Sequence, residues 1–214
     1  MIMTAIVTVI AAYLIGSINF AVVFSGVFLK KDVRDMGSGN AGTTNMMRVG
    51  GFLPGALTFL CDALKGFVAC FIGELIFEYI LNATSASWAL PSNGAFLCGL
   101  ACMLGHVFPI FFQFKGGKGV ATSVGIFAVC CPIAIIIGLC VFAVSTLLSR
   151  IVSLSSLIAT VTVVVMSVIF YDRSGSLAVQ IILSVAMGLI VFLKHKENII
   201  RLINGEENKI GRRK

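Results

Sequence analysis

Long runs of apolar residues, separated by short polar segments, dominate this chain of 214 residues. The chain is 58% hydrophobic and 12% charged, whereas soluble domains are about 25% charged. A helix needs about 20 apolar residues to cross a bilayer core of about 30 Å. The pattern therefore predicts an all-α integral membrane protein, with clear spans at roughly 4–28, 53–81, 94–114, 151–171 and 176–193.

The apolar run 120–149 is too long for one comfortable span and short for two, and Pro132 lies near its middle. Lys118 precedes this run and Arg150 ends it, and basic residues gather in cytoplasmic loops. If both lie on the same side, the run crosses twice or does not fully cross. We expect two short helices that meet near Pro132, with a re-entrant pair as the alternative. This gives about seven transmembrane helices in a single domain, 1–214.

Fourteen of the sixteen Lys and Arg residues fall into three loops and the C-terminal tail. Their placement predicts an N-terminus outside and a C-terminus in the cytoplasm. The net charge of +7 does not indicate a nucleic-acid partner, because these residues form no groove-length stripe. The first apolar run lacks the basic n-region and clear cleavage site of a signal peptide, so we interpret it as a retained span. The fourteen are Lys30, Lys31, Arg34, Arg48, Lys115, Lys118, Arg150, Lys194, Lys196, Arg201, Lys209, Arg212, Arg213 and Lys214; the others are Lys65 and Arg173.

The seven cysteines all fall in apolar context, and none forms a C-x-x-C pair. Cys98 and Cys102 have the spacing of one helix face, but no histidine or further cysteine stands beside them to complete a metal site. We interpret the cysteines as small packing residues and expect no metal centre.

The first polar segment is 34–51, RDMGSGNAGTTNMMRVGG. Its glycines permit tight turns, and backbone N–H groups exposed in such a loop favour an anion. Arg48 adds a bidentate partner for a phosphate or carboxylate. The alternative is an ordinary cytoplasmic connection whose arginines only set topology. The crowding of Gly, Ser, Asn and Thr into a few positions favours a shaped, anion-binding loop.

The second polar segment is 105–122, GHVFPIFFQFKGGKGVAT. Lys115 and Lys118 alternate with glycines just before a helix, and a helix N-terminus with free amides and lysine charge suits a phosphate. The spacing of a nucleotide-binding P-loop is absent, so nucleotide hydrolysis is not indicated. The alternative is a basic anchor that only sets topology. His106 taken alone is more typical of a structural histidine than of a catalyst.

The third polar segment is 195–207, HKENIIRLINGEE, directly after the last apolar run. Helical spacing places His195 near Asn198, and Glu197 near Arg201. Histidine is the side chain best suited to proton transfer near neutral pH, and Glu197 is placed to order an arginine. The alternative is an amphipathic tail lying on anionic lipid.

Within the second span, Asp62 and Lys65 are three residues apart and can share a helix face. Ionisable groups in a span normally face the bundle interior or a wet cavity. We therefore expect the two side chains to neutralise each other's charge and to give structural support to the cytoplasmic site.

All three polar segments are predicted to lie on the same side of the membrane, and all three carry phosphate-binding chemistry. A single anion does not need so many groups. Two phosphate-bearing substrates do, above all if one carries a long acyl tail between the helices.

The three segments, in this order, resemble the three motifs of the bacterial acyl-phosphate-dependent glycerol-3-phosphate acyltransferases (the PlsY type). The resemblance rests on SGNAGTTNMMR, on GHVFPIFFQFKGGKGVAT and on HKENIIR, and it covers nearly the whole chain. It implies transfer of a fatty acyl group from acyl phosphate to the 1-hydroxyl of sn-glycerol 3-phosphate. The products are then lysophosphatidic acid and phosphate, in a bacterial cytoplasmic (inner) membrane with the site facing the cytoplasm.

The resemblance also implies roles for individual residues. Lys196 stands where arginine is common in the family, and Ser153 resembles a further polar position near the family's site. The catalytic candidates are Ser38, Arg48, Lys118 and His195. The substrate-binding candidates are Gly39, Asn40, Thr44, Asn45, Lys115, Gly116, Gly117, Gly119, Thr122, Ser153, Asn198 and Arg201, with Asp62, Lys65 and Glu197 as structural support.

An acyl phosphate is already activated, so we expect no ATP, coenzyme A, metal or other cofactor. We expect direct attack without an acyl-enzyme, with the phosphates neutralised by Lys115, Lys118 and Arg48. His195 and the substrate's own phosphate are both candidates for the base. The H-x-x-x-x-D signature of the other glycerophosphate acyltransferase class is missing. The partners are the two substrates and membrane lipids, and we expect a monomer.

Two other functions compete with this interpretation. A transporter of a small phosphorylated metabolite also needs basic, glycine-rich sites, but transporters commonly bind near the bilayer midplane and show internal repeats. Here the polar segments gather on one side, and no repeat is visible. A non-catalytic assembly subunit leaves the His195 segment unexplained.

Overall fold

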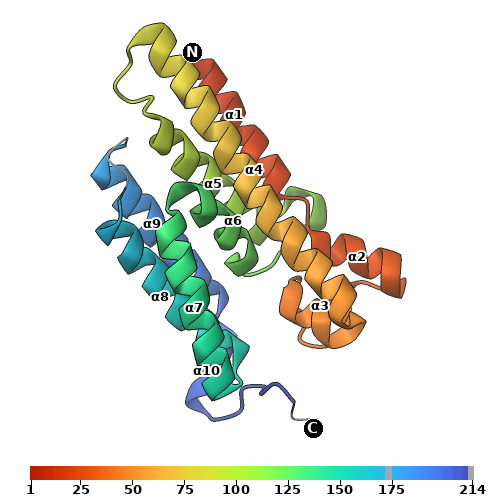
Figure 1. The fold of residues 1–214 in the computed structure, drawn as a ribbon. Helices are drawn as coiled ribbons and strands as arrows, with labels where there is room; N and C mark the ends of the chain where they lie inside the picture. Colours follow the sequence, from red (N-terminus) through yellow and green to blue (C-terminus); the bar gives the residue numbers. More distant parts are fainter. Residues whose placement is uncertain (172–174, 212–214) are drawn as a thin grey trace.

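A computed structural model of the protein describes residues 1–171 and 175–211 (Figure 1). Arg173, Arg212, Arg213 and Lys214, which contribute to the predicted orientation, lie outside these residues. Within the described ranges all regular structure is helical, as predicted. The elements are α1 (Ile2–Gly16), α2 (Phe20–Leu29), η1 (Val33–Asp35), α3 (Thr43–Gly50), α4 (Phe52–Thr84), α5 (Pro91–Val107), η2 (Ile110–Phe112), α6 (Val120–Cys130), α7 (Pro132–Ser149), α8 (Val152–Ile169), α9 (Leu177–Lys194) and α10 (Lys196–Ile203).

Six helical stretches in the described part of the chain are long and apolar enough to cross a membrane, and α6 is a shorter apolar helix. They match the predicted spans to within a few residues, so the predicted all-helical membrane architecture is confirmed. The six are Ile2–Leu29, Phe52–Thr84, Pro91–Phe112, Pro132–Ser149, Val152–Ile169 and Leu177–Lys194.

The first span differs from the expected continuous helix, because it breaks between α1 and α2. Asn19 caps α2: its side-chain oxygen accepts a hydrogen bond from the N–H of Val22 at 3.2 Å. The break leaves the carbonyl of Ile18 without a helical partner, and Lys65 Nζ on α4 donates to it at 2.7 Å. An unpaired carbonyl is costly inside a membrane, so a lysine from the neighbouring helix stabilises the break.

The disputed run 120–149 divides at Pro132, as the sequence predicts. Pro132 is the first residue of α7, a position where proline costs no hydrogen bond. At 1.5 Å per residue α6 is about 17 Å long, well short of a bilayer core of about 30 Å. Arg150 at the end of α7 accepts a hydrogen bond from the N–H of Ile210, which follows α10. Lys118 contacts α10 itself, so Lys118 and Arg150 lie at the same end of the bundle.

The helices form two groups, which are joined by α6 and by direct packing of α5 against α9 (Figure 1). α1, α4 and α5 pack together, α7, α8 and α9 pack together, and α6 lies between α4 and α7. α4 and α6 approach closely at two glycines: a Cβ on Gly125 would collide with the carbonyl of Ala63, and one on Gly66 would collide with the carbonyl of Thr122. Small residues allow such close helix packing in membranes. The core helix α6 is thereby fixed, and its N-terminal end carries the glycine-rich segment.

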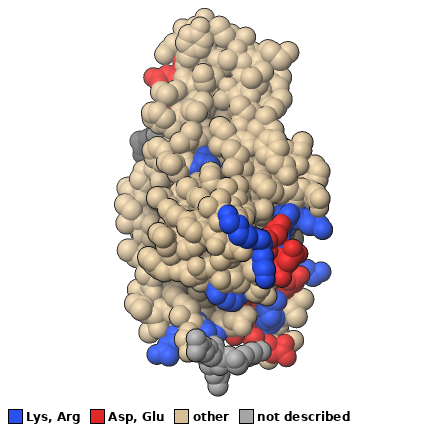
Figure 2. Space-filling view, turned by 90° about the vertical axis from the view of Figure 1, so that its right-hand side faces the viewer, with Lys and Arg blue, Asp and Glu red and all other residues tan. Residues whose placement is uncertain are grey.

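Charged side chains gather at one end of the molecule. In Figure 2 they gather mainly along the lower right and the bottom of the visible face, toward the end where α10 lies in Figure 1, while the upper part is mostly uncharged. The short helix α3 and the segment 30–42 bring the first polar segment to this lower half. A bundle with one charged end and long apolar helices is consistent with a site at one membrane surface.

Candidate active site

The first polar segment is organised by Asn45, which is buried at the start of α3. Its side-chain oxygen accepts a hydrogen bond from the N–H of Ser38 at 2.8 Å. Its side-chain nitrogen donates to the carbonyls of Val33 at 3.0 Å and Met36 at 2.9 Å. These contacts use both ends of the amide to shape the loop, which indicates a positioning role for Asn45 rather than contact with a substrate.

The loop that Asn45 shapes presents its polar groups outward. Ser38, Gly39, Thr44 and Arg48 are exposed, and Asn40 is half-buried. The N–H groups of Ser38 and Gly39 are already bonded, to Asn45 and to the carbonyl of Met36. The exposed hydroxyls and the guanidinium of Arg48 are the groups that an anion can reach.

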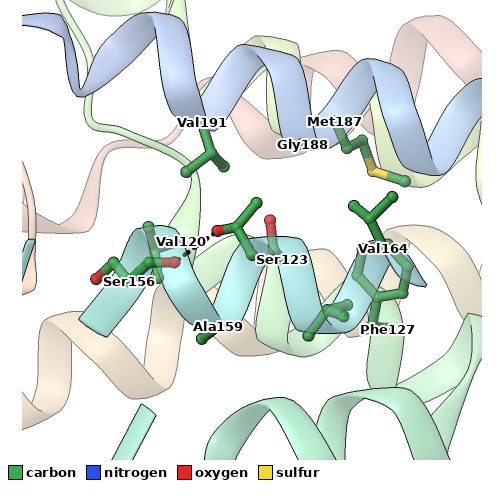
Figure 3. Close-up of a pocket in the computed structure, with 11 residues that line it drawn as sticks. Val120, Ser123, Phe127, Ser156, Ala159, Val164, Met187, Gly188 and Val191 are labelled. Atoms are coloured by element: carbon green, nitrogen blue, oxygen red, sulfur yellow. Dashed lines mark hydrogen bonds between the residues drawn. The ribbon is translucent and has the colours of Figure 1, made fainter. Parts of the chain in front are cut away.

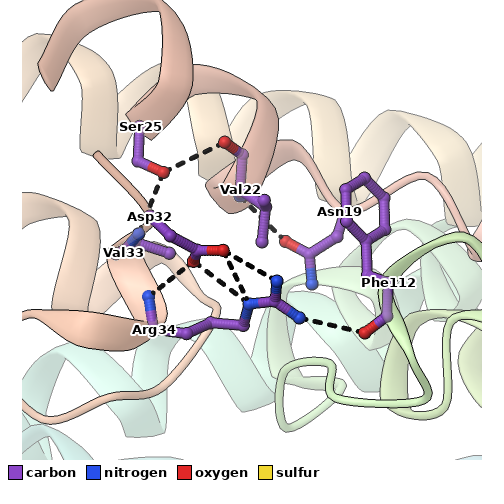
Figure 4. A network of polar contacts seen from close by, with 7 residues as sticks. All are labelled: Asn19, Val22, Ser25, Asp32, Val33, Arg34 and Phe112. Carbon is purple, nitrogen blue, oxygen red and sulfur yellow. Dashed lines mark hydrogen bonds and ion pairs between the residues drawn. The ribbon is translucent and has the colours of Figure 1, made fainter. Parts of the chain in front are cut away.

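Arg34 connects the first polar segment to the second (Figure 4). Its guanidinium binds Asp32 at 2.7 Å, and its Nη1 donates to the carbonyl of Phe112 at 2.9 Å. The hydrogen bond from Arg34 holds the pKa of the Asp32 carboxyl below its ordinary value. The pair therefore stays ionised at neutral pH, and Arg34 connects the two segments through its contacts with Asp32 and Phe112.

The glycine-rich turn meets the first polar segment at Gly117. The N–H of Gly117 donates to the carbonyl of His106 at 3.2 Å. A Cβ on Gly117 would collide with Nε2 of His106 and would lie 2.7 Å from the carbonyl oxygen of Ala41. Only glycine leaves room for this approach. The structure therefore brings segments 38–45 and 115–119 together.

The third polar segment joins the second through the side chain of Lys118. Lys118 Nζ donates a hydrogen bond to Oδ1 of Asn198, and Nδ2 of Asn198 donates to Glu207 at 3.1 Å. Arg201 Nε donates to the other oxygen of Glu207 at 2.9 Å. Glu197, expected to order Arg201, lies 3.9 Å from it with its side chain 87% exposed. Glu207 is thus the main carboxylate partner of Arg201, and the sequence reasoning did not single it out.

The charge of Lys118 lies in a partly dehydrated site. Burial lowers the pKa of Lys118 to about 8, an effect opposed by Glu207 and reinforced by Arg201 and Arg48. The influence of Arg48, from the first polar segment, shows that all three segments share one electrostatic environment. At pH 7 the ammonium form still predominates, and it would gain stability from a bound anion.

His195 is buried directly beyond α9. Its Nδ1 lies 2.8 Å from the carbonyl of Val191. A carbonyl only accepts, so Nδ1 carries the proton and Nε2 of the neutral ring is an acceptor. Burial, and then the positive charge of Lys118, lower the pKa of His195 to about 4. His195 is therefore neutral at pH 7.

The remaining predicted residues divide into exposed and buried positions. Lys115 is exposed, while Gly116 and Gly119 flank the turn in partly buried and buried positions. Thr122 on α6 and Ser153 on α8 have buried hydroxyls that lack a hydrogen-bond partner within the described structure. These hydroxyls remain candidates for substrate contact, since buried polar groups are normally paired.

The predicted pair Asp62 and Lys65 forms a buried ion pair of 2.7 Å on α4. Nδ1 of His106, on α5, lies 3.1 Å from the same lysine nitrogen. His106 is thus a paired, buried side chain, as expected of a structural histidine. Nowhere in 1–171 or 175–211 do three or more His, Cys, Asp or Glu side chains form a group placed to hold a metal ion.

An apolar cavity of about 50 Å³ opens between α6, α8 and α9 (Figure 3). Val120, the first residue of α6, lines one end. A second cavity of about 170 Å³ between α8 and α9 shares Thr160, Val164 and Gly188 with the first. Together they form an apolar groove that begins two residues from Lys118 and opens toward the outside of the bundle.

Comparison with known proteins agrees with the arrangement of these segments. The sequence model of the family described as glycerol-3-phosphate acyltransferase matches residues 6–205. The chain is 41% identical to glycerol-3-phosphate acyltransferase 2 of Bacillus anthracis, over 96% of this chain and 98% of that protein. It is also 41% identical to the glycerol-3-phosphate acyltransferase of Listeria monocytogenes, over 93% of each.

Solved structures show the same fold. The crystal structure of PlsY (YgiH), an integral membrane glycerol 3-phosphate acyltransferase in its glycerol 3-phosphate form, matches with a TM-score of 0.81 and 37% identity, over 97% of this chain and 96% of that one. Its lysophosphatidic acid form matches with a TM-score of 0.78. The resemblance seen in the three motifs is confirmed, and the chain belongs to the glycerol-3-phosphate acyltransferase family of integral membrane enzymes.

Proposed function

We propose that this acyltransferase takes its acyl group from an acyl phosphate and transfers it to the 1-hydroxyl of glycerol 3-phosphate, giving lysophosphatidic acid and inorganic phosphate. The observation that carries the proposal is the position of Lys118. It is a half-buried cation close enough to Arg48 and Arg201 for both to lower its pKa, and it stands two residues before Val120, which lines the apolar groove. A molecule with a phosphate joined directly to a fatty acyl chain fits both halves of this arrangement.

The groove between α6, α8 and α9 is the proposed place of the acyl chain. Its lining is mostly aliphatic, from Val120 at the phosphate end to Val165 and Val185 farther along α8 and α9. Three hydroxyl-bearing residues, Ser123, Ser156 and Thr160, are the polar members of this lining. Burying each methylene of a fatty chain contributes about 0.8 kcal/mol. The chain would then enter from the lipid while its phosphate meets the glycine-rich segment.

The proposed reaction is a direct attack. The 1-hydroxyl oxygen forms a bond to the acyl carbonyl carbon, the bond from that carbon to the phosphate oxygen breaks, and the electron pair leaves with inorganic phosphate. The hydroxyl proton passes to His195 or to a substrate phosphate. Lys118, Arg48 and the exposed hydroxyl of Ser38 stabilise the negative charge that develops, and the enzyme aligns the two substrates.

The geometry of His195 supports an orienting role. Because Nδ1–H is held by Val191, the free acceptor Nε2 is available to the substrate hydroxyl. A histidine whose pKa is about 4 is a weak base. Part of that lowering comes from Lys118, so an anionic substrate that neutralises Lys118 would raise the pKa of His195 and make it a better proton acceptor.

The proposed location is the bacterial inner membrane, with the site on the cytoplasmic side and the N-terminus outside. The clustering of basic residues at the site end supports this orientation. All three polar segments come from one chain, which supports a monomer as the active unit.

The donor is tested with purified protein, glycerol 3-phosphate and either palmitoyl phosphate or palmitoyl-coenzyme A. We expect release of phosphate and formation of lysophosphatidic acid with palmitoyl phosphate alone. Turnover with the thioester and not with the acyl phosphate would refute the proposed donor. Solute uptake into sealed vesicles without acyl transfer would instead support a transporter.

Two further measurements test the residues and the direct attack. Lys118→Ala should lose most activity while it remains inserted and folded, and Lys31→Ala, at an exposed lysine outside the site, serves as the control. Full activity of Lys118→Ala would remove the phosphate assignment. Mass spectrometry that finds a productive acyl group on Ser38 would replace direct attack by an acyl-enzyme.

A further inference from the structure

The ion pair Asp62–Lys65 and His106 form a buried cluster directly beneath the glycine-rich turn. The three side chains come from α4 and α5, and their residues are 0%, 5% and 2% exposed. Lys65 Nζ forms an ion pair with Asp62 Oδ1 at 2.7 Å, donates to the carbonyl of Ile18 at 2.7 Å and lies 3.1 Å from Nδ1 of His106. An ammonium group has three hydrogens, which is enough for these three contacts.

This arrangement determines the tautomer of His106. An ammonium group has no acceptor, so Nδ1 of His106 must accept from Lys65. The carboxylate of Asp62 is farther from Nδ1, at 3.5 Å, and is already paired with the ammonium group of Lys65. The ring is therefore neutral, and its proton lies on Nε2.

The protonated Nε2 of His106 faces the point where two polar segments meet. A Cβ on Gly117 would collide with Nε2 and would lie 2.7 Å from the carbonyl oxygen of Ala41. His106 therefore contacts Gly117 twice, because its carbonyl also accepts the Gly117 N–H at 3.2 Å. Ala41 belongs to the first polar segment and is buried, and Lys118 is the next residue after Gly117.

We propose that His106 is a positioning residue for acyl transfer. Its Nδ1 is anchored by Lys65, and its Nε2–H side supports Gly117 next to Ala41. The ring thereby fixes the place of Lys118 relative to the first polar segment. The inference rests on the proposed assignment of the glycine-rich segment to a substrate phosphate. His106 itself is buried and acts through the backbone of the turn.

Two conservative substitutions test the roles of the two ring nitrogens, Nδ1 and Nε2, separately. In His106→Asn the amide reaches the position of Nδ1 and can still accept from Lys65, but nothing replaces Nε2. In His106→Gln the amide reaches the position of Nε2 and leaves Lys65 with one acceptor fewer. We expect His106→Asn to keep the thermal stability of the parent and to raise the KM of a phosphate-bearing substrate about tenfold, as loss of substrate alignment would.

His106→Gln should show the opposite behaviour, with a lower Tm in detergent and KM values close to those of the parent. Both variants are assayed with glycerol 3-phosphate and the acyl donor each varied in turn. If both variants change only the Tm and leave every KM unchanged, His106 is merely structural and the proposal is wrong.

A double-mutant cycle gives a second test that does not depend on either amide. Gly117→Ala introduces a methyl that meets the ring, and in the His106→Ala background that collision is absent. We expect the loss of kcat/KM caused by Gly117→Ala to be about fivefold smaller in that background. Equal losses in both backgrounds would overturn the proposal. A wrong phosphate assignment would give a different result from a wrong role for His106. In that case Lys118→Ala would be active, while the double-mutant cycle would still show coupling between His106 and Gly117.

Discussion

The side chain of Lys118 donates a hydrogen bond to the side-chain oxygen of Asn198, and this contact connects the glycine-rich segment to α10. Asn198 in turn donates to Glu207, which binds Arg201. The amide therefore joins a half-buried cation to an ion pair, and it can only do so in one orientation. Asn198 fixes the position of Lys118 without cancelling its charge.

The first prediction concerns this amide. Asn198→Ala removes the acceptor that holds Lys118, so kcat/KM should fall about a hundredfold, as expected when a charged group loses its catalytic alignment. Phosphate release from purified, monodisperse protein measures the effect. The control is Asn204→Ala, an exposed residue at the end of the same helix. Activity close to the parent in Asn198→Ala would show that Lys118 does not need this contact.

The second prediction is an alkaline limb in the pH profile. Because the pKa of Lys118 is lowered to about 8, its positive charge is lost as the pH rises through 8. We expect kcat/KM to decline above that pH. Bound anions favour the charged lysine, so the decline in kcat should begin at higher pH than that in kcat/KM.

Lys118→Arg tests the origin of this limb, since a guanidinium does not titrate in this range. Its residual activity should stay level where that of the parent falls. An unchanged alkaline limb in Lys118→Arg would assign the titration to another group.

The third prediction concerns stability at acidic pH. His195 has a pKa of about 4 in the folded protein against an ordinary value of 6.5. Between these values the unfolded chain binds a proton that the folded chain does not, so the free energy of unfolding should fall as the pH drops from 6.5 to 4. The full window corresponds to roughly 3 kcal/mol.

Thermal unfolding in detergent, compared between the parent and His195→Asn, isolates this contribution. An asparagine can still donate to the Val191 carbonyl but does not titrate. The difference in Tm between the two proteins should therefore narrow or reverse on acidification. A difference that is constant from pH 7 to pH 4 would contradict the burial of a neutral His195.

Much of the fold follows from local sequence signals. Run length predicts the spans, and Pro132 predicts where α6 gives way to α7, because proline removes a helical donor. The break between α1 and α2 was missed because the run is apolar throughout and the interruption depends on a partner, Lys65, from another helix. Asn19 was the available signal, since asparagine is a strong helix cap.

The candidate site shows the same division between local and tertiary information. The spacing of Asp62 and Lys65 on one helix correctly predicts their ion pair. Glu207 reaches Arg201 only because the chain turns at Gly205, which has a φ of 71°. Helical spacing instead suggested Glu197. The Asn-Gly pair at 204–205 marks a turn, but nothing in it specifies which side chain the returning segment would meet.

The last prediction tests the apolar groove through Gly188. A Cβ at this position would lie 3.0 Å from Cγ2 of Val164 and 3.8 Å from Cγ2 of Thr160, both of which line the two joined cavities. Gly188→Leu should therefore fill the groove and lower kcat/KM for palmitoyl phosphate by about tenfold or more, since the lost burial of two methylenes alone is worth about that factor. Butyryl phosphate has a chain too short to enter far into the groove. The kcat/KM of Gly188→Leu for this donor should therefore be close to that of the parent. Gly26→Leu is the matched control, because a Cβ on Gly26 meets no atom within 4 Å. An equal loss for both donors would place the acyl chain elsewhere.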